Sequence, residues 1–599
     1  MNLADVRGVD TAGLGDLATS LASRASSFEA ARAQFAKITR FPGWSGSAKD
    51  AAAGSFQNTD KSLLDDVARV SAVHQATLEL AADFQQLQAR LRELEKEAAS
   101  LGAKLGDDGK VTFPEGAPWP DPTQQQRASV IGSEAYALVL DADRLDEKAG
   151  EVLKRAASGE ITSAGADNET MAALSGAAQG TLGVPEPPKG DKGGPVSPVF
   201  NTAWWNDLTP QQREWVESSH PEWVGNLDGV PASARDEANR KQLPGEIVKL
   251  QAEVDRLQKQ KDSELGHGAF TNTDSDLWYA QRRLEGAKAV EKALRDNPGT
   301  KLMVFDPEHG QRGLAAIATG DPDTADHISV TTPGVNSSPE HSIGDLTKEA
   351  AEQKRETEKI LNKNGHGNET VSTIAWIGYE PPQAQIDFSH IPGEHDFDNV
   401  GPAGWRDEPA GLSDVSSEAK AKVGAASLSQ FYEGLSAAWH PAEGDSGTSP
   451  HVTAFGHSYG SLTTSLALQQ TVPGIVENAV FYGSPGLELA SVDQLPVAPG
   501  HAYTMQAPND PIQMVPDNIP RFGPNPAEIP GITRLSTEAG DTTGDAAPGT
   551  VVHHDGASGH SEYPRSSNGQ LRMPGYNMAV ILAGMTGQDG RPDLTVKGQ

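Results

Sequence analysis

The sequence contains no cysteine among its 599 residues. This excludes disulfides, thiolate metal ligands and a cysteine nucleophile, and it leaves the redox compartment open. No run of 18 or more apolar residues is present, so we expect no span across a membrane. The first residues lack the basic and apolar segments of a secretory signal peptide. We therefore expect a cytoplasmic protein, or one that is exported without a Sec signal.

Positive charge is also scarce, because 82 Asp and Glu outnumber 49 Lys and Arg and leave a net charge of −33. Such a surface repels phosphate backbones, so we expect no nucleic-acid partner. The sequence holds no H-E-x-x-H motif, no P-loop and no G-x-G-x-x-G after a strand. These absences argue against metal, nucleoside triphosphate and dinucleotide chemistry, and we expect no cofactor.

The first region, residues 1–157, is rich in Ala, Leu and Gln and predicts an all-α hairpin or bundle. One segment carries ten residues at steps that alternate between three and four, as in the packing face of a coiled coil. These residues are Val70, Val73, Thr77, Leu80, Phe84, Leu87, Leu91, Leu94, Ala98 and Leu101. Residues 158–199 are rich in Gly, Pro, Ser and Thr, which predicts a flexible linker.

Residues 200–599 form the third region, which begins with a helical lead-in over 200–300. Short β-prone runs then alternate with helical segments, for example "TVSTIAWIGYEPP", the helix around "SSEAKAKVGAASLSQFYEGL", "HVTAF" and "NAVFYGSPG". This alternation predicts an α/β domain with a mainly parallel sheet that is flanked by helices on both faces. In such sheets, functional sites gather at the carboxyl ends of the strands.

Ser458 lies at the junction between the strand "HVTAF" and the helix "SLTTSLALQQ", within the pattern G-x-S-x-G. This is the context of a nucleophile elbow, in which Gly456 and Gly460 are needed because a Cβ at either position would clash in the tight turn. His457 and Tyr459 complete the elbow. The alternative is an ordinary serine in a turn.

A serine nucleophile needs a base, and the base needs an orienting acid. Asp510 follows the strand-like "HAYTM" and is our candidate acid, with Asp493 and Asp517 as rivals and a plain Asn-Asp-Pro turn as the alternative. The candidate bases in the late segment "TVVHHDGASGHSEYPR" are His553, His554 and His560. Position alone does not choose among the three histidines.

Seven segments in order are similar to an α/β-hydrolase family of formerly unknown function that is common in high-GC Gram-positive bacteria. They begin "WWNDLTPQQREWVE" and "FDPEHGQRGLAAIATGDPDTADHISVTTPGV", and continue with "IAWIGYEPP", "FGHSYGS", "FYGSPG", "APNDPI" and "SGHSEY". The resemblance implies an α/β-hydrolase fold and a triad of Ser458, Asp510 and His560. It also implies an oxyanion hole from backbone N–H groups of Tyr459 and of the segment Pro333-Gly334-Val335, through Gly334 and Val335.

The first 157 residues resemble the helical hairpins of type VII secretion substrates. The segment "GWSGSAKDAA" is similar to their W-x-G turn, with Trp44 and Gly46 in the matching positions. Packing of Trp44 at a helix corner explains the same residues. The chain departs from the export signal Y-x-x-x-[D/E], because Tyr136 is followed by Leu140. We expect this module to bind a helical partner protein or to self-associate.

Together these observations predict a serine hydrolase that cleaves a small-molecule or lipid ester through an acyl-enzyme, with activity that rises with pH through a histidine pKa of about 6.5 when unperturbed. Two alternatives remain. One is a non-catalytic hydrolase-fold scaffold whose N-terminal helices bind a partner, and the other is an acyltransferase with the same triad. The insert at residues 383–409 is either a lid or a structured loop.

Overall fold

The computed structural model describes residues 1–38, 45–114, 122–166, 168–184, 186–189, 196–208, 210–264, 272–383, 417–442, 449–514, 522–543, 551–585, 594 and 596. The chain divides into two compact units. The first comprises Met1–Lys189 and Ala203–Arg213, and the second comprises Gly190–Thr202 and Glu214–Gln599. The helices α6 (Pro198–Asp207) and α7 (Pro210–Ser219) each contribute to both units.

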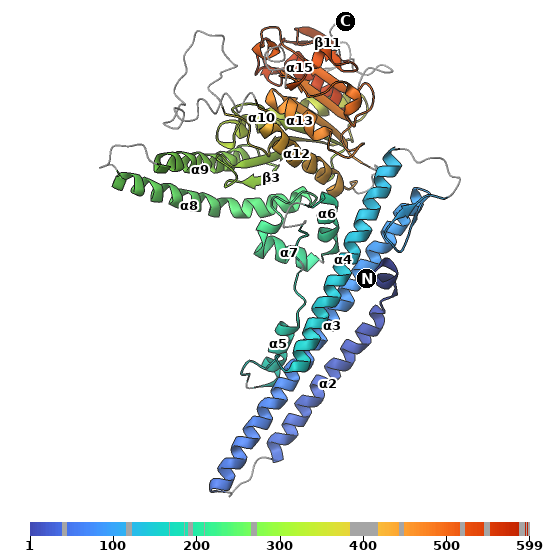
Figure 1. Ribbon diagram of the computed structural model, residues 1–599, viewed down its shortest axis with the longest axis vertical. Coiled ribbons are helices and arrows are strands. Elements are labelled where there is room, and N and C mark those ends of the chain that lie inside the picture. Colours follow the sequence, from blue (N-terminus) through green and yellow to red (C-terminus); the bar gives the residue numbers. More distant parts are fainter. Residues whose placement is uncertain are drawn as a thin grey trace. The chain divides into compact units, whose positions relative to one another are not determined.

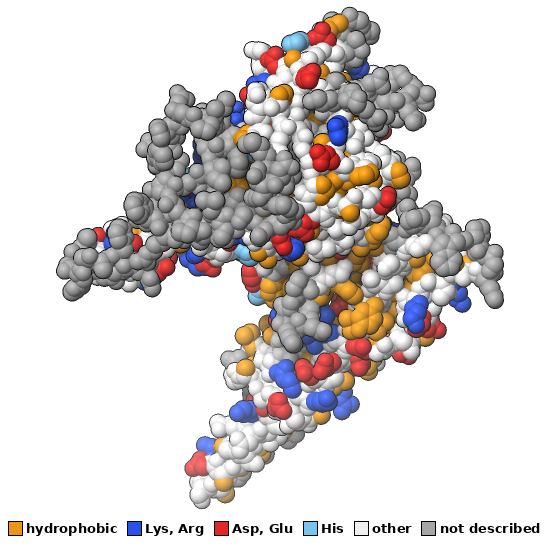
Figure 2. Space-filling view, turned by 45° about the horizontal axis from the view of Figure 1, so that its top comes forward, with side chains coloured by type: hydrophobic (Ala, Val, Ile, Leu, Met, Phe, Trp, Pro, Cys, Tyr) orange, Lys and Arg blue, Asp and Glu red, His pale blue; other side chains and the backbone are white. Residues whose placement is uncertain are grey.

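The first unit is dominated by long helices that run side by side (Figure 1). Its elements are α1 (Leu3–Gly8), α2 (Thr11–Ile38), α3 (Ser47–Ser100), β1 (Lys104–Leu105), β2 (Val111–Thr112), α4 (Pro122–Ser158) and α5 (Glu169–Gly180). Part of the predicted packing face of α3 is buried against α4. Its residues Phe84, Leu87, Leu91 and Leu94 are at most 2% exposed. Outside this face, acidic and basic side chains alternate over the surface of the unit (Figure 2).

Residues 158–199 differ in part from the predicted flexible linker, because residues 169–180 form α5, which packs on α3. The reason is the close approach that small residues allow. A Cβ built on Gly176 would lie 2.0 Å from the carbonyl oxygen of Ala68, and one on Gly180 would lie 2.1 Å from that of Ala72. Composition alone suggests a linker here, whereas the spacing of these glycines serves a helix–helix contact.

The second unit is built on an eight-stranded sheet in the order β10-β9-β8-β7-β5-β6-β4-β3. The strands are β3 (Thr300–Asp306), β4 (Leu314–Thr319), β5 (His327–Thr332), β6 (Val371–Ile377), β7 (His451–His457), β8 (Asn478–Tyr482), β9 (Ala502–Met505) and β10 (Thr533–Leu535). All neighbours from β10 to β6 pair in parallel, and only β4 pairs antiparallel with β6 and β3. This sheet and the helical first region confirm the predicted fold class.

Helices cover both faces of the sheet, as Figure 1 shows. The apolar side chains of α12 (Ala419–Ala438) and α13 (Tyr459–Leu468) pack on one face. The other face is covered by α8 (Ala232–Glu264), α9 (Asn272–Asp296), α10 (Pro339–Lys363) and α15 (Met573–Leu582). The remaining elements are η2 (Pro221–Trp223), η3 (Val492–Gln494), η4 (Pro511–Met514), η6 (Pro526–Glu528), β11 (Gly540–Thr543), β12 (Val551–His554), β13 (Ser566–Ser567) and β14 (Gln570–Leu571).

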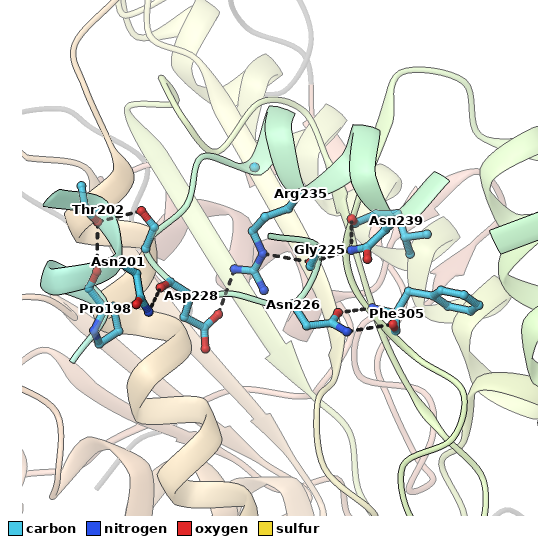
Figure 3. Close-up of polar contacts among 12 residues, drawn as sticks. Pro198, Asn201, Thr202, Gly225, Asn226, Asp228, Arg235, Asn239 and Phe305 are labelled. Atoms are coloured by element: carbon cyan, nitrogen blue, oxygen red, sulfur yellow. Dashed lines mark hydrogen bonds and ion pairs between the residues drawn. The ribbon is translucent and has the colours of Figure 1, made fainter. Parts of the chain in front are cut away.

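The loop before α8 and the first turns of that helix cover the edge strand β3 with polar side chains (Figure 3). The Asn226 side chain donates to the carbonyl of Phe305 and accepts from the N–H of the same residue, at 2.9 and 2.8 Å. Asn239 donates to the carbonyl of Leu302, and Asp236 accepts from the N–H of Leu302. These contacts satisfy backbone groups that would otherwise be open to pairing with another strand.

Candidate active site

Ser458 occupies a strained turn between β7 and α13. Its φ of 53° and ψ of −132° lie outside the conformations that non-glycine residues normally adopt. The flanking glycines leave no room for a side chain: a Cβ on Gly456 would lie 2.6 Å from the Cα of Ser461, and one on Gly460 would lie 2.2 Å from the carbonyl oxygen of Thr332. The strain and the close approach are both features of a nucleophile elbow.

Asp510 and His560, which are 50 positions apart, form a hydrogen-bonded pair. The Nδ1 of His560 lies 2.9 Å from each carboxylate oxygen of Asp510. The carboxylate also accepts from the Tyr563 hydroxyl at 2.7 Å and from the backbone N–H of Ile512 at 3.0 Å. Burial raises the pKa of Asp510, but these donors and the imidazole outweigh burial and lower the pKa overall.

The pair of Asp510 and His560 lies beside the turn at Ser458. The backbone N–H of Ser458 donates to the carbonyl of Tyr482 at 3.0 Å. The next residue, Gly483, has a φ of 54°, and a Cβ built on it would lie 3.1 Å from Oδ2 of Asp510 and 3.3 Å from Cε1 of His560. The carboxyl end of β8 therefore connects the serine to the pair. Ser458, Asp510 and His560 are all buried, and their exposed fractions are 2%, 3% and 5%.

The two rival histidines have other partners. The Nδ1 of His553 lies 2.7 Å from Asp541 on the neighbouring strand β11, and the His553 side chain is 60% exposed. His554 is fully buried, with Nδ1 2.7 Å from the carbonyl oxygen of Leu571 and Nε2 3.0 Å from the hydroxyl of Thr542. Of the three candidates, the structure brings His560 to Asp510.

Neither rival acid replaces Asp510 as the partner of His560. The carboxylate of Asp493 accepts from the hydroxyl of Ser491, the residue that caps η3. Asp517 lies outside the described residues. Asp510, in contrast, directly precedes η4, and its carboxylate accepts from three donors.

The segment after β5 lies against Ser458. A Cβ built on Gly334 would lie 2.5 Å from Cβ and 2.8 Å from Oγ of Ser458, and 3.0 Å from the backbone nitrogen of Tyr459. The carbonyl of the preceding Pro333 accepts from the buried hydroxyl of Tyr379 at 2.7 Å, which fixes the course of this segment. Only glycine allows this backbone so close to the serine.

Comparison with known proteins agrees with this architecture. A family profile described as "Alpha/beta hydrolase" matches residues 306–520. An uncharacterized protein of Mycobacterium tuberculosis, Rv0963c, is 36% identical over 305 residues, which cover 51% of this chain and 96% of the relative. The chain belongs to the alpha/beta hydrolase family.

One relative matches over a longer part of the chain. A second uncharacterized protein of Mycobacterium tuberculosis, Rv2079, is 29% identical over 411 residues, or 64% of this chain and 57% of the relative. A protein of Mycobacterium bovis, Mb0988c, matches at 36% identity over 305 residues, 51% of this chain and 96% of its own length. No solved structure matched the chain.

Two site residues were not singled out by sequence reasoning. Tyr563 donates to Asp510 and accepts from the N–H of Ala507 at 2.7 Å, so its hydroxyl joins two segments of the site. Tyr379 fixes the segment after β5. Both tyrosines lie in segments that carried the family resemblance: Tyr563 is three positions after His560, and Tyr379 is two positions after the end of β6. Their roles depend on contacts between distant segments, which a local pattern does not report.

The remaining predicted residues lie elsewhere. Gly46 has a φ of 105° and precedes the first turn of α3, whereas Trp44 lies outside the described residues. The predicted insert 383–409 lies outside them as well, apart from Gln383. Within the described ranges, no group of three His, Asp or Glu side chains could hold a metal ion. Over the same ranges, every helix is too short or too polar to cross a bilayer.

Proposed function

We propose that this member of the alpha/beta hydrolase family is a serine hydrolase that cleaves carboxylic esters through an acyl-enzyme. The observation that carries the proposal is the pairing of His560 with both oxygens of Asp510 beside a serine on a strained elbow. Hydrogen bonding through Nδ1 leaves Nε2 of His560 as the basic nitrogen, as the chemistry of a serine triad requires. The low pKa of Asp510 keeps the acid ionised.

The reaction would proceed in two halves. Oγ of Ser458 attacks the ester carbonyl while Nε2 of His560 takes its proton, and Asp510 stabilises the imidazolium. The N–H of Tyr459, with an N–H from Gly334 or Val335, stabilises the oxyanion. His560 then gives the proton to the leaving alcohol as the bond from the carbonyl carbon to the alcohol oxygen breaks. A water molecule, activated by the same imidazole, hydrolyses the acyl-serine and restores the enzyme.

Hydrolysis of p-nitrophenyl acetate, butyrate and octanoate by the full chain tests this proposal. A burst of p-nitrophenol that equals the enzyme concentration would reveal the acyl-enzyme. Replacement of Ser458 by Ala should lower kcat by about 10⁴-fold or more, since removal of a triad member leaves only the residual contribution of binding and the oxyanion hole. Equal rates in wild type and Ser458→Ala would contradict the proposal and favour a non-catalytic scaffold.

A second candidate, acyl transfer, draws support from the burial of the site. Ser458 is 2% exposed and His560 is 5% exposed, and exclusion of water is what lets another acceptor compete for an acyl-enzyme. Addition of a primary alcohol or amine to the same assay distinguishes the reactions by their products. An ester or amide product that exceeds the free acid at millimolar acceptor would identify a transferase, whereas free acid alone would identify a hydrolase.

A further inference from the structure

His457 is the last residue of β7 and directly precedes Ser458. Its ring is partly buried and lies among three other rings of the site. It stacks on Tyr482 with centroids 4.9 Å apart and an interplanar angle of 22°, and it lies 4.8 Å from the ring of His560 and 6.2 Å from that of Tyr563. The residue next to the nucleophile is therefore in contact with the base.

The contact includes a hydrogen bond to the backbone of the base. The Nε2 of His457 lies 2.8 Å from the carbonyl oxygen of His560. Because a carbonyl oxygen only accepts, Nε2 must carry the hydrogen. Burial among the rings and the charge that develops on His560 lower the pKa of His457 to about 3. The ring is consequently a neutral donor over the working range of the enzyme, and it places no fixed positive charge beside the catalytic imidazole.

His560 needs such an anchor because it lies on a turn between β12 and β13. Other contacts hold the start of the turn: the Glu562 carboxylate accepts from the N–H groups of Ser558 and Gly559 at 2.7 and 3.2 Å, and the N–H of Asn509 donates to the carbonyl of Ser558 at 3.1 Å. These contacts do not involve the peptide carbonyl of His560. The bond from His457 therefore joins the base's own residue to the strand that carries the nucleophile.

We propose that His457 is the positioning residue of this site, which fixes the backbone of His560 relative to Ser458 through a neutral Nε2–H donor. This inference rests on the proposed function. The bond spans from the residue before the nucleophile to the residue of the base, so it determines the distance over which the proton is transferred. Misplacement of a catalytic group by about 1 Å costs on the order of 100-fold in rate.

Two substitutions separate the donor from the ring. His457→Phe keeps the stack on Tyr482 and removes the donor, whereas His457→Gln keeps an N–H donor at similar reach and removes the ring. We expect kcat for p-nitrophenyl butyrate to fall about 100-fold in His457→Phe, with KM within threefold of wild type. In His457→Gln, which keeps a donor, kcat should lie within about tenfold of wild type. The melting temperature of both variants, measured in parallel, reports folding.

The outcomes separate the inference from the proposed function. Wild-type kcat in a folded His457→Phe variant would overturn the inference, and so would a His457→Gln variant that is as slow as His457→Phe. A loss of rate that follows the loss in melting temperature across both variants would make His457 a structural residue only, which also overturns it. The rate–pH profile of His457→Gln should retain the midpoint of wild type, since neither residue carries charge. A wild type that neither hydrolyses ester nor depends on Ser458 would instead overturn the proposed function, and the inference with it.

Discussion

Gly334 offers the sharpest structural test of the oxyanion segment. In Gly334→Ala, the new Cβ would lie 2.5 Å from Cβ of Ser458, 2.8 Å from its Oγ and 3.0 Å from the nitrogen of Tyr459. Ordinary carbon–carbon contacts are about 3.5–4.0 Å, so the first contact is too short by about 1 Å. Oγ of Ser458 could rotate away, but Cβ of Ser458 and the nitrogen of Tyr459, a donor of the proposed oxyanion hole, cannot move unless the backbone moves.

The expected loss in kcat depends on which atoms move to relieve the clash in Gly334→Ala. If the segment after β5 withdraws by about 1 Å, the oxyanion loses a donor, which costs on the order of 10²–10³ in kcat. If the serine moves instead, the misplaced nucleophile costs a similar factor. Overpacking a buried site also lowers the free energy of unfolding by about 1–3 kcal/mol. Because Gly334 does not have a positive φ, the backbone itself accepts alanine, and the effect of Gly334→Ala is steric.

The assay compares kcat and KM for p-nitrophenyl butyrate with urea unfolding in the same variants. Gly344→Ala on α10 is the matched control, because a Cβ there meets nothing within 4 Å, and alanine in an exposed helix is neutral or stabilising by up to about 1 kcal/mol. We expect Gly334→Ala to lose at least 100-fold in kcat and Gly344→Ala to match wild type. Full activity in Gly334→Ala would refute the placement of the oxyanion segment against Ser458.

Two further predictions concern the acid and a distant ion pair. Tyr563→Phe removes the hydroxyl that donates to Asp510 and accepts from Ala507. We therefore expect kcat to fall about tenfold and the free energy of unfolding, measured in urea, to fall by about 1–3 kcal/mol. If both quantities matched wild type, the hydroxyl would be dispensable. The hydrogen bond that His451 donates to the carboxylate of Glu477 raises the pKa of His451 above its unfolded value of 6.5. This pair therefore contributes stability that is fully present below pH 6.5 and is lost as pH rises through the folded pKa. Glu477→Gln should therefore lower the urea midpoint more at pH 5.5 than at pH 8.5, and an equal loss at both values would contradict the assignment.

Local features of the sequence were sufficient to predict the fold class and to place Ser458 at a turn between a strand and a helix. The G-x-S-x-G pattern lies between an apolar strand and a helix, and the geometry of Ser458, Gly456 and Gly460 is determined within a few residues of chain. The alternation of strands and helices likewise reports the parallel sheet, since βαβ connections bring successive strands together. These predictions succeed because the interactions that determine them are short in sequence.

The positions of the three histidines in the sequence did not identify the proposed base. His553, His554 and His560 lie within eight residues, and the family resemblance, not the residues themselves, favoured the last. The structure separates them by partners that are distant in the chain: Asp541 for His553, Leu571 for His554 and Asp510 for His560. A one-dimensional pattern cannot report which of three neighbouring side chains turns toward a given carboxylate.

The helix α5 shows a case in which composition suggested the wrong local structure. Its small residues suggest a linker by composition, yet Gly176 and Gly180 face the backbone of α3, where any larger side chain would clash. The same composition favours flexibility in isolation and close packing beside a partner helix, so only tertiary structure decides. The W-x-G-like role of Trp44, the helical partner of residues 1–157 and export without a Sec signal stay predictions.

The most direct test of the account is covalent labelling of the full chain by a fluorophosphonate, read by intact mass and by mapping of the modified peptide. The wild type should gain one adduct at Ser458, because only an activated serine reacts quickly. The adduct should be absent in Ser458→Ala and form slowly in His560→Ala, while His553→Ala and His554→Ala react at the wild-type rate. No adduct in the wild type, or an adduct formed equally fast without His560, would contradict the assignment of Ser458 and His560 as nucleophile and base.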